Sequence, residues 1–304
     1  MEIKNIAQRL ADICSIDRVV ESEAMSVHTY FKIGGPADLL VTPITVEEVK
    51  AVIDLCITSK VPYMVIGNGT NLLVSDKGIR GVVIKIAEAF NDYRVEGNKI
   101  VAAAGNLLTA LSKVAMAHNL GGFEFASGIP GTIGGAIVMN AGAYGGEMKD
   151  VVTAVTYIDD KGQLIKATNA EMDFAYRKSC ISGTGNVVLE VEMTFDTKAA
   201  DEIKVIIDAL TVKRTTKQPL EMPSAGSTFK RPPDNFAGKL IDDAGLRGLR
   251  HGDAQVSEKH CGFVVNRGAA TANEVEALIK TVQKTVYDQF GVLLEPEVKI
   301  IGER

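Results

Sequence analysis

Apolar residues in the first third of the chain recur with helical spacing in some segments and in short continuous runs in others. Residues 1–20 have apolar positions every three or four residues, which predicts an amphipathic helix. Thr45 and Glu48 have the spacing of a capping box, so a second helix is expected to begin there and to end near Ser59. Buried strands are predicted over residues 37–41, 63–66 and 81–86.

The middle of the chain has the spacing of antiparallel strands. Gly97-Asn98 separates two short alternating segments, and residues 159–162 separate two more, so two hairpins are expected. A further strand is predicted over 187–195 and a helix over 107–119. This part of the chain therefore predicts an α+β domain built around an antiparallel sheet.

The last third returns to helical spacing. Thr271 and Glu274 form a second capping box, and the long helix that it opens is expected to end at Gly291. The segment 292–300 reads as a strand in which Pro296 favours an edge or a bulge. Two more helices and one strand are predicted over 202–212, 236–246 and 261–265.

These elements predict an α+β protein in three parts. The first part is residues 1–86 together with a final strand in 294–304, the second is 87–200, and the third is 201–293. At 304 residues the chain is long enough for two or three such modules.

Composition narrows the class of protein. A formal net charge of −5 disfavours nucleic acid as the main partner, because phosphate binding needs a clustered basic surface. The apolar runs are too short to span a bilayer, and the opening residues MEIKNIAQRL lack the core of a signal peptide. Four cysteines without paired spacing are expected to be reduced thiols, so a cytoplasmic protein is expected.

Two glycine-rich loops are the first sign of chemistry. Seven of the residues from Gly128 to Gly146 are glycine, and a second loop of this kind covers residues 67–71. Glycine lets a backbone lie directly against a ligand, and a run of exposed N–H groups makes a concave site for phosphate. One such loop alone is as often an ordinary connection, but two suit a cofactor that has both a pyrophosphate and a ring system.

Other common motifs are missing from the sequence. No G-x-G-x-x-G fingerprint opens a βαβ unit, and there is no P-loop, H-E-x-x-H motif or nucleophile elbow. The four histidines are too dispersed to indicate a metal site.

Six short motifs, in order and at plausible spacing, carry a resemblance to a known family, and they cover residues 30–37, 67–74, 129–135, 176–179, 226–230 and 294–298. The chain resembles the UDP-N-acetylenolpyruvoylglucosamine reductase (MurB) family, flavin enzymes of peptidoglycan precursor synthesis, over about residues 25–301. The resemblance implies the FAD-binding fold of the vanillyl-alcohol oxidase type with a C-terminal α+β substrate-binding domain. The short stretch after Tyr176-Arg177 resembles the second type of the family, which lacks an extra substrate loop.

The resemblance also implies roles for individual residues. The catalytic group would be Arg177, Ser227 and Glu297, and substrate contacts would come from Tyr176, Lys230, Arg231 and Arg214. Some members of the family have Asn in place of Arg231, which leaves its role in holding the substrate diphosphate open. Arg214 and Lys217 are alternative diphosphate contacts, although basic residues at the end of a helix are usually just solvated. Non-covalent FAD would be held by Gly67, Asn68, Gly69, Thr70, Asn71, Leu72, Gly128, Ile129, Pro130, Gly131, Thr132, Gly134 and Gly135.

Taken from the residues alone, each catalytic candidate has an ordinary alternative. Without the resemblance these ordinary roles are favoured: Arg177 as half of a surface ion pair, Ser227 as a turn hydroxyl and Glu297 as a charge at a strand edge. The three types make sense together for an enol ether that carries a carboxylate. Hydride addition to one alkene carbon develops negative charge that a guanidinium stabilises, and the other carbon needs a proton from a nearby donor.

The resemblance implies that NADPH is the electron donor and that a UDP-sugar enolpyruvate is the substrate. A flavin oxidase of the same fold, acting on a small alcohol or hydroxy acid, is the alternative enzyme. A flavin-binding module without turnover is the alternative outside the enzymes. The sequence leaves the oligomeric state open.

Overall fold

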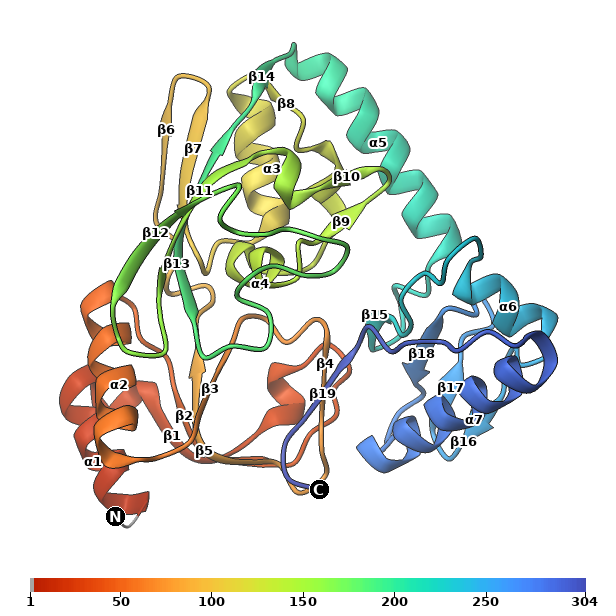
Figure 1. Ribbon diagram of the computed structural model, residues 1–304, viewed down its shortest axis with the longest axis horizontal. Helices are drawn as coiled ribbons and strands as arrows, with labels where there is room; N and C mark the ends of the chain where they lie inside the picture. The colour runs from red at the N-terminus through yellow and green to blue at the C-terminus, as the bar shows by residue number, and fades with distance from the viewer. Residues whose placement is uncertain (1–2) are drawn as a thin grey trace. The chain divides into compact units, whose positions relative to one another are not determined.

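The computed structural model describes residues 3–304, and its internal contacts divide the chain into two compact units (Figure 1). Of the described residues, unit 1 contains 3–21, 39–68 and 81–214, and unit 2 contains 22–38, 69–80 and 215–304. Each unit is thus assembled from segments that are far apart in the sequence. Four elements belong to both units, because the division falls within β1 (Val19–Ala24), β2 (Pro36–Val41), β5 (Ile79–Lys85) and α5 (Ala200–Lys217).

The helices at the start of unit 1 form largely as the apolar spacing predicts. Helix α1 covers Ile3–Cys14, so the predicted helix over 1–20 is too long, because the chain turns into a short 3-10 helix and then into β1. Helix α2 covers Val46–Ser59, and the Thr45 hydroxyl accepts the N–H of Glu48 as predicted. The Glu48 carboxylate bonds to the N–H of Ile44 instead of closing the capping box on Thr45.

The main sheet of unit 1 is antiparallel throughout and has the order β12-β11-β13-β7-β6. Both predicted hairpins are present in it, one between β6 and β7 and the other between β11 and β12. Helices α3 (Leu108–Ala117) and α4 (Ile133–Val138) share one buried core with these strands and with α1 and α2. The strands are β6 Tyr93–Glu96, β7 Lys99–Ala103, β11 Val152–Ile158, β12 Leu164–Thr168 and β13 Val187–Thr194.

Smaller elements complete unit 1. Strands β3 (Tyr63–Ile66) and β5 (Ile79–Lys85) pair in parallel, and α5 (Ala200–Lys217) leads toward unit 2 in the sequence. Two short antiparallel pairs remain, formed by β8 Leu120–Gly121 with β14 Asp196–Thr197 and by β9 Gly142–Ala143 with β10 Gly146–Glu147.

Unit 2 packs two helices against a small sheet of order β15-β18-β17-β16 (Figure 1). Helix α7 (Ala272–Phe290) has the predicted capping box, and Gly291 ends it in the left-handed conformation. Helix α6 (Ala237–Asp243) is shorter than predicted, because Gly245 turns the chain with a φ of 74°. The strands are β15 Ser224–Ser227, β16 Arg250–His251, β17 Ala254–Val256 and β18 Phe263–Asn266.

The end of the chain differs from its predicted form. Only β19 (Lys299–Ile301) is a strand, and it pairs in parallel with β4 (Leu72–Val74). The preceding residues 292–298 form no strand, and their β-type pairing is limited to an isolated bridge between Phe229 and Pro296. The prediction of a strand over 292–300 is therefore wrong for its first seven residues, because β4 pairs only with Lys299–Ile301.

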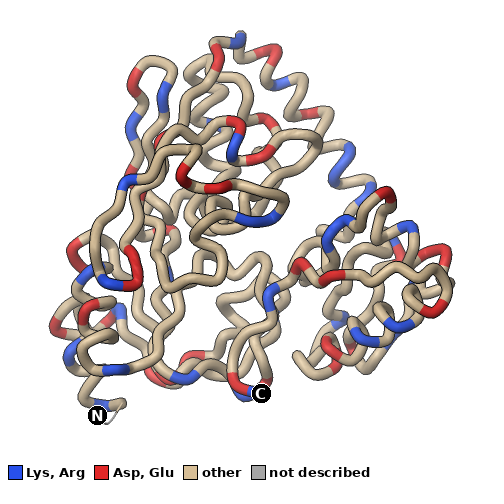
Figure 2. The backbone as a smooth tube through the Cα atoms, in the orientation of Figure 1, with Lys and Arg blue, Asp and Glu red and all other residues tan. Residues whose placement is uncertain are grey.

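The distribution of charged side chains and the state of the cysteines are those of an ordinary globular protein. Figure 2 shows Lys and Arg interspersed with Asp and Glu along both units. All four cysteines are free, as predicted, and burial raises the pKa of Cys14 and of Cys56 to about 11. Among the residues described, no helix has the length and apolarity to cross a membrane.

Candidate active site

The two glycine-rich loops meet inside unit 1. Gly67 follows strand β3, and Thr132 is the N-cap of α4, where its hydroxyl accepts the N–H of Gly135. A methyl group on Gly67 would lie 2.3 Å from the Thr132 hydroxyl oxygen. Glycine is therefore required at position 67 for the first loop to touch the second, and both loops border one space.

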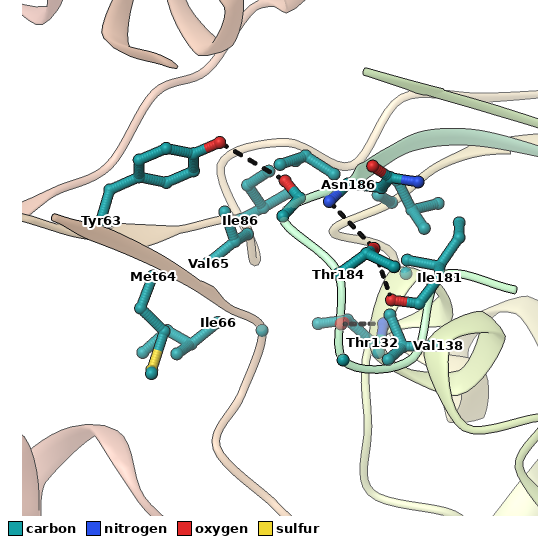
Figure 3. A pocket seen from close by; sticks show the side chains of 18 residues that line it. Tyr63, Met64, Val65, Ile66, Ile86, Thr132, Val138, Ile181, Thr184 and Asn186 are labelled. Carbon is teal, nitrogen blue, oxygen red and sulfur yellow. Dashed lines mark hydrogen bonds between the residues drawn. The ribbon is translucent and has the colours of Figure 1, made fainter. Parts of the chain in front are cut away.

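That space is a cavity of about 270 Å³ (Figure 3). Strand β3 forms one side of it, and the loop and strand start over residues 181–188 form the other. This volume is near the lower end of the roughly 300–1,000 Å³ of small-molecule pockets, so the cavity suits one ring system of a larger ligand. Side chains that line it include Tyr63, Ile66, Ile86, Thr132, Val138 and Ile181.

One wall of the cavity was not anticipated from the sequence. The Tyr63 hydroxyl donates to the carbonyl of Gly185 at 3.4 Å, and burial raises the pKa of Tyr63. Gly183, with a φ of 78°, and Gly185 allow this loop to turn beside β3. The available signal was a third cluster of glycines shortly after the Tyr-Arg motif.

Arg177 lies in unit 1 on a strained turn. The backbones of Ala175 and Lys178 bond to each other in both directions, which leaves Tyr176 and Arg177 as the two central residues of the turn. Arg177 has a φ of 56°, a conformation that is uncommon for any residue but glycine and that concentrates at functional sites. Its guanidinium lies 5.1 Å from the centre of the Tyr176 ring and donates to the carbonyl of Gly142 at 3.1 Å.

A second arginine contacts the same hairpin. The guanidinium of Arg214 is 6.0 Å from the centre of the Tyr144 ring, and Tyr144 is in the turn between β9 and β10. The Nε and Nη1 atoms of Arg214 lie against Gly128, each 3.0 Å from where a Cβ atom would be. Nε is buried without a hydrogen-bond partner, which typically costs about 1–3 kcal/mol.

Ser227 and Glu297 are brought together in unit 2. The carbonyl of Thr228 accepts the N–H of Glu297 at 2.8 Å, so the residue after Ser227 is bonded to the segment that carries Glu297. Gly226 has a φ of 73° and forms an irregularity in the β15–β18 pairing, and Ser227 directly after it is exposed. Glu297 is half-buried.

The first glycine loop also supports the Glu297 segment. The side-chain amide of Asn71 donates to the carbonyl of Glu297 at 3.1 Å, and the backbone of Lys299 donates to the Asn71 carbonyl at 2.9 Å. Leu72 then begins strand β4, which pairs with β19. Asn71 and Leu72, both predicted to contact the cofactor, therefore also hold a predicted catalytic residue in place.

The two basic residues after Ser227 have partners within unit 2. Lys230 forms an ion pair with Glu295, and its backbone N–H donates to the carbonyl of the same residue at 2.9 Å. Arg231 lies over the ring of Phe236, with 4.1 Å between the guanidinium carbon and the ring centre. Both side chains are thus held on the segment that follows Ser227.

Comparisons of the sequence and of the structure with known proteins agree on one family. The FAD binding domain model matches residues 37–168, and the model for the C-terminal domain of UDP-N-acetylenolpyruvoylglucosamine reductase matches residues 218–301. Proteins named UDP-N-acetylenolpyruvoylglucosamine reductase from Clostridioides difficile (strain 630) and Alkaliphilus metalliredigens (strain QYMF) are 51% and 52% identical to the chain. Each alignment covers all of both proteins.

The chain belongs to the UDP-N-acetylenolpyruvoylglucosamine reductase family.

A solved structure of that family supports the fold. The crystal structure of the reductase from Thermus caldophilus, 38% identical, has a TM-score of 0.80 and covers 93% of this chain and 97% of its own. The predicted α+β fold with an FAD-binding part and a C-terminal domain is therefore confirmed, as are the assignment to the oxidoreductases of peptidoglycan precursor synthesis and the prediction of FAD. The three-part division at residues 86, 200 and 293 stays a prediction.

The first loop fits the family's FAD. Within residues 3–304, no group accepts a hydrogen bond from the backbone N–H groups of Asn68, Gly69 and Thr70. A run of unpaired amides is what a pyrophosphate requires. Gly69 has a φ of 60°, and a Cβ atom there would lie 2.1 Å from the carbonyl oxygen of His28, so no other residue permits this loop.

Gly135 provides a test of the cavity as a cofactor site. A methyl group there would meet only the Thr132 hydroxyl, at 3.5 Å, whereas one on Gly134 would lie 2.9 Å from the Cβ atom of Ala104. Gly135→Ala is expected to leave the melting temperature of the FAD-free protein unchanged or higher, because alanine also favours a helix. If FAD occupies the cavity, overpacking of about 1–3 kcal/mol raises its Kd by roughly 5- to 150-fold.

Gly134→Ala is the matched control, since it is expected to lower the melting temperature of the FAD-free protein itself. Titration of the FAD-free proteins with FAD gives the Kd values. A Gly135→Ala variant that binds FAD with unchanged affinity would show that the cavity is not part of the cofactor site.

Proposed function

We propose that the chain is an NADPH-dependent UDP-N-acetylmuramate dehydrogenase that reduces UDP-N-acetylglucosamine enolpyruvate. Beyond membership of the family, the observation that carries this proposal is the joining of Ser227 and Glu297 through Thr228. A hydroxyl and a carboxyl on adjacent, hydrogen-bonded segments suit protonation of a carbon atom. Neither is needed by a protein that only stores a flavin.

Bound FAD would supply the hydride that reduces the enol ether. We assign Arg177 to the substrate carboxylate, where negative charge grows once hydride has been added. A planar guanidinium presents two parallel N–H groups to a carboxylate, and its bond to the Gly142 carbonyl fixes it before the substrate arrives. A preorganised charge of this kind stabilises a transition state better than water does.

We assign Ser227 to the proton. A hydroxyl is a weak acid at neutral pH, but the carbanion-like carbon of the enolate is basic enough to take its proton. Glu297 would orient the hydroxyl or hydrogen-bond to the enol. The exposed position of Ser227 after Gly226 supports this role, because a turn hydroxyl that served the fold would be bonded within it.

Contacts with the rest of the substrate are proposed for Tyr176, Lys230 and Arg231. Tyr176 is exposed beside Arg177, and the other two follow Ser227 in the sequence. Lys230 is already paired with Glu295, so a diphosphate would compete with that carboxylate for its ammonium group.

Anaerobic stopped-flow spectroscopy tests the function. NADPH is expected to bleach the flavin absorbance of the yellow holoenzyme, and UDP-N-acetylglucosamine enolpyruvate is expected to restore it without oxygen. The alternative, an oxidase of the same fold, would instead be bleached by a small alcohol or hydroxy acid and restored by oxygen. Failure of NADPH to bleach the flavin, or of the sugar nucleotide to restore it, contradicts the proposal.

A further inference from the structure

Arg214 is a cation without a counterion in unit 1. Among residues 3–304 its side chain has no hydrogen bond and no ion pair, and it lies against Gly128 and near the Tyr144 ring. An arginine at the end of a helix is ordinarily solvated, but the Nε atom of Arg214 is sealed from solvent. A structural arginine with a buried Nε normally donates to a carboxylate or a carbonyl.

Gly128 faces the guanidinium of Arg214 on the side of the buried Nε. Gly128 does not have a φ in the left-handed range, so its backbone conformation does not call for glycine. Glycine is needed at this position because of the guanidinium, since a Cβ atom on residue 128 would lie 3.0 Å from Nε and from Nη1 and 3.1 Å from Cδ of Arg214. The position of the Arg214 guanidinium thus depends on glycine at residue 128. Gly128 belongs to the loop assigned above to FAD.

The guanidinium of Arg214 has a defined orientation, and its Nη groups are still available as hydrogen-bond donors. With Nε held against the loop, the Nη groups remain without any partner among the described residues and without being buried. Arg177 bonds to the same β9–β10 hairpin at Gly142, so both arginines belong to one region of unit 1. A fixed, unpaired fork of N–H donors is what an anion with adjacent oxygen or nitrogen acceptors requires.

We infer that Arg214 binds an anionic part of FAD and not the diphosphate of the sugar nucleotide. The inference rests on the proposed function, since it takes the Gly128 loop as part of the FAD site. Two parts of FAD carry negative charge, the pyrophosphate in both redox states and the isoalloxazine ring after reduction. The two sources differ in one measurable respect, the effect of Arg214 on the flavin reduction potential.

The test compares Arg214→Gln with Lys213→Gln, which removes the same charge from the preceding, exposed residue of α5. The Kd for oxidised FAD is measured with the FAD-free proteins, and the midpoint potential is measured with the reconstituted ones. Loss of a charge-assisted hydrogen bond is expected to weaken FAD by about ten- to hundredfold in at least one redox state. Lys213→Gln is expected to stay within about twofold of the wild type.

The pattern distinguishes the two sources. If Arg214 contacts the pyrophosphate, its substitution raises the Kd for oxidised FAD and leaves the midpoint potential unchanged. The potential stays the same because oxidised and reduced FAD lose the same binding free energy. A contact with the reduced ring leaves the Kd for oxidised FAD near normal and lowers the potential by about 30 mV for each tenfold loss. Gly128→Ala, which displaces the guanidinium, is expected to reproduce the result of Arg214→Gln and provides a second variant if that one does not fold.

An Arg214→Gln enzyme with normal FAD affinity and normal potential but a raised KM for the sugar nucleotide would overturn the inference in favour of a substrate contact. So would one in which all three quantities are normal. Failure of the proposed function looks different, because the wild-type holoenzyme would then not be reoxidised by the sugar nucleotide.

Discussion

Ser227→Ala is expected to bind FAD and to be reduced by NADPH at nearly normal rates, while its reoxidation by the enolpyruvyl sugar nucleotide slows severely. Loss of a positioned acid typically costs about 10²–10⁴-fold, and only the second half-reaction needs a proton on carbon. Stopped-flow measurement of the two half-reactions separates them. Ser227 is exposed, and its backbone alone maintains the β15–β18 pairing, so the alanine variant is expected to fold.

Two further variants sharpen this experiment. Ser227→Cys retains a transferable proton and is expected to recover part of the rate. Ser224→Ala removes a hydroxyl from the other end of the same strand and is expected to leave both half-reactions unchanged. If Ser227→Ala slows only the NADPH half-reaction, or neither, then the proton comes from Glu297 or water.

Arg177→Lys is expected to lower turnover by about 10²–10³-fold with a much smaller change in KM. Lysine keeps the positive charge, so it still attracts the carboxylate, but it replaces a planar fork with a point charge. Removing one donor from a preorganised anion site has costs of this size because the charge develops in the transition state. Steady-state kinetics at varied sugar nucleotide concentration gives both constants.

The backbone provides an internal control for this variant. Arginine and lysine are equally strained at a φ of 56°, so the melting temperature is expected to stay constant. Lys178→Gln, a change at the exposed residue that completes the same turn, is expected to keep full turnover. An Arg177→Lys enzyme as fast as the wild type would remove Arg177 from the catalytic group.

Features set by near neighbours in the sequence were predictable. The capping hydroxyls of Thr45 and Thr271 need only a residue three positions on, and the hairpin at Gly97 needs only its own turn. The motifs for FAD and for the C-terminal domain were identifiable for a related reason, since each is a short contiguous stretch. Locally encoded structure of this kind does not depend on which distant segments meet.

Features that depend on distant partners were not predictable. The strand predicted over 292–300 is mostly unpaired, because β4 accepts only its last residues. Glycine at 128 looked like loop flexibility, but it makes room for Arg214, which is far away in the sequence. No local pattern indicates that Tyr63 lies beside Gly185 or that Arg177 adopts a left-handed backbone.

The hydrogen bond from Asn71 to Glu297 can form only late in synthesis on the ribosome, after both residues have been made. Its two residues are 226 positions apart, which at about 5–20 residues per second means a delay of roughly 11–45 s between them. Throughout that interval β4, with the sequence Leu72-Leu73-Val74, has been made but its pairing strand β19 has not. An apolar strand left unpaired is prone to join another chain. The nascent chain therefore passes through a period of exposure to misassembly that ends only when its final strand has been made.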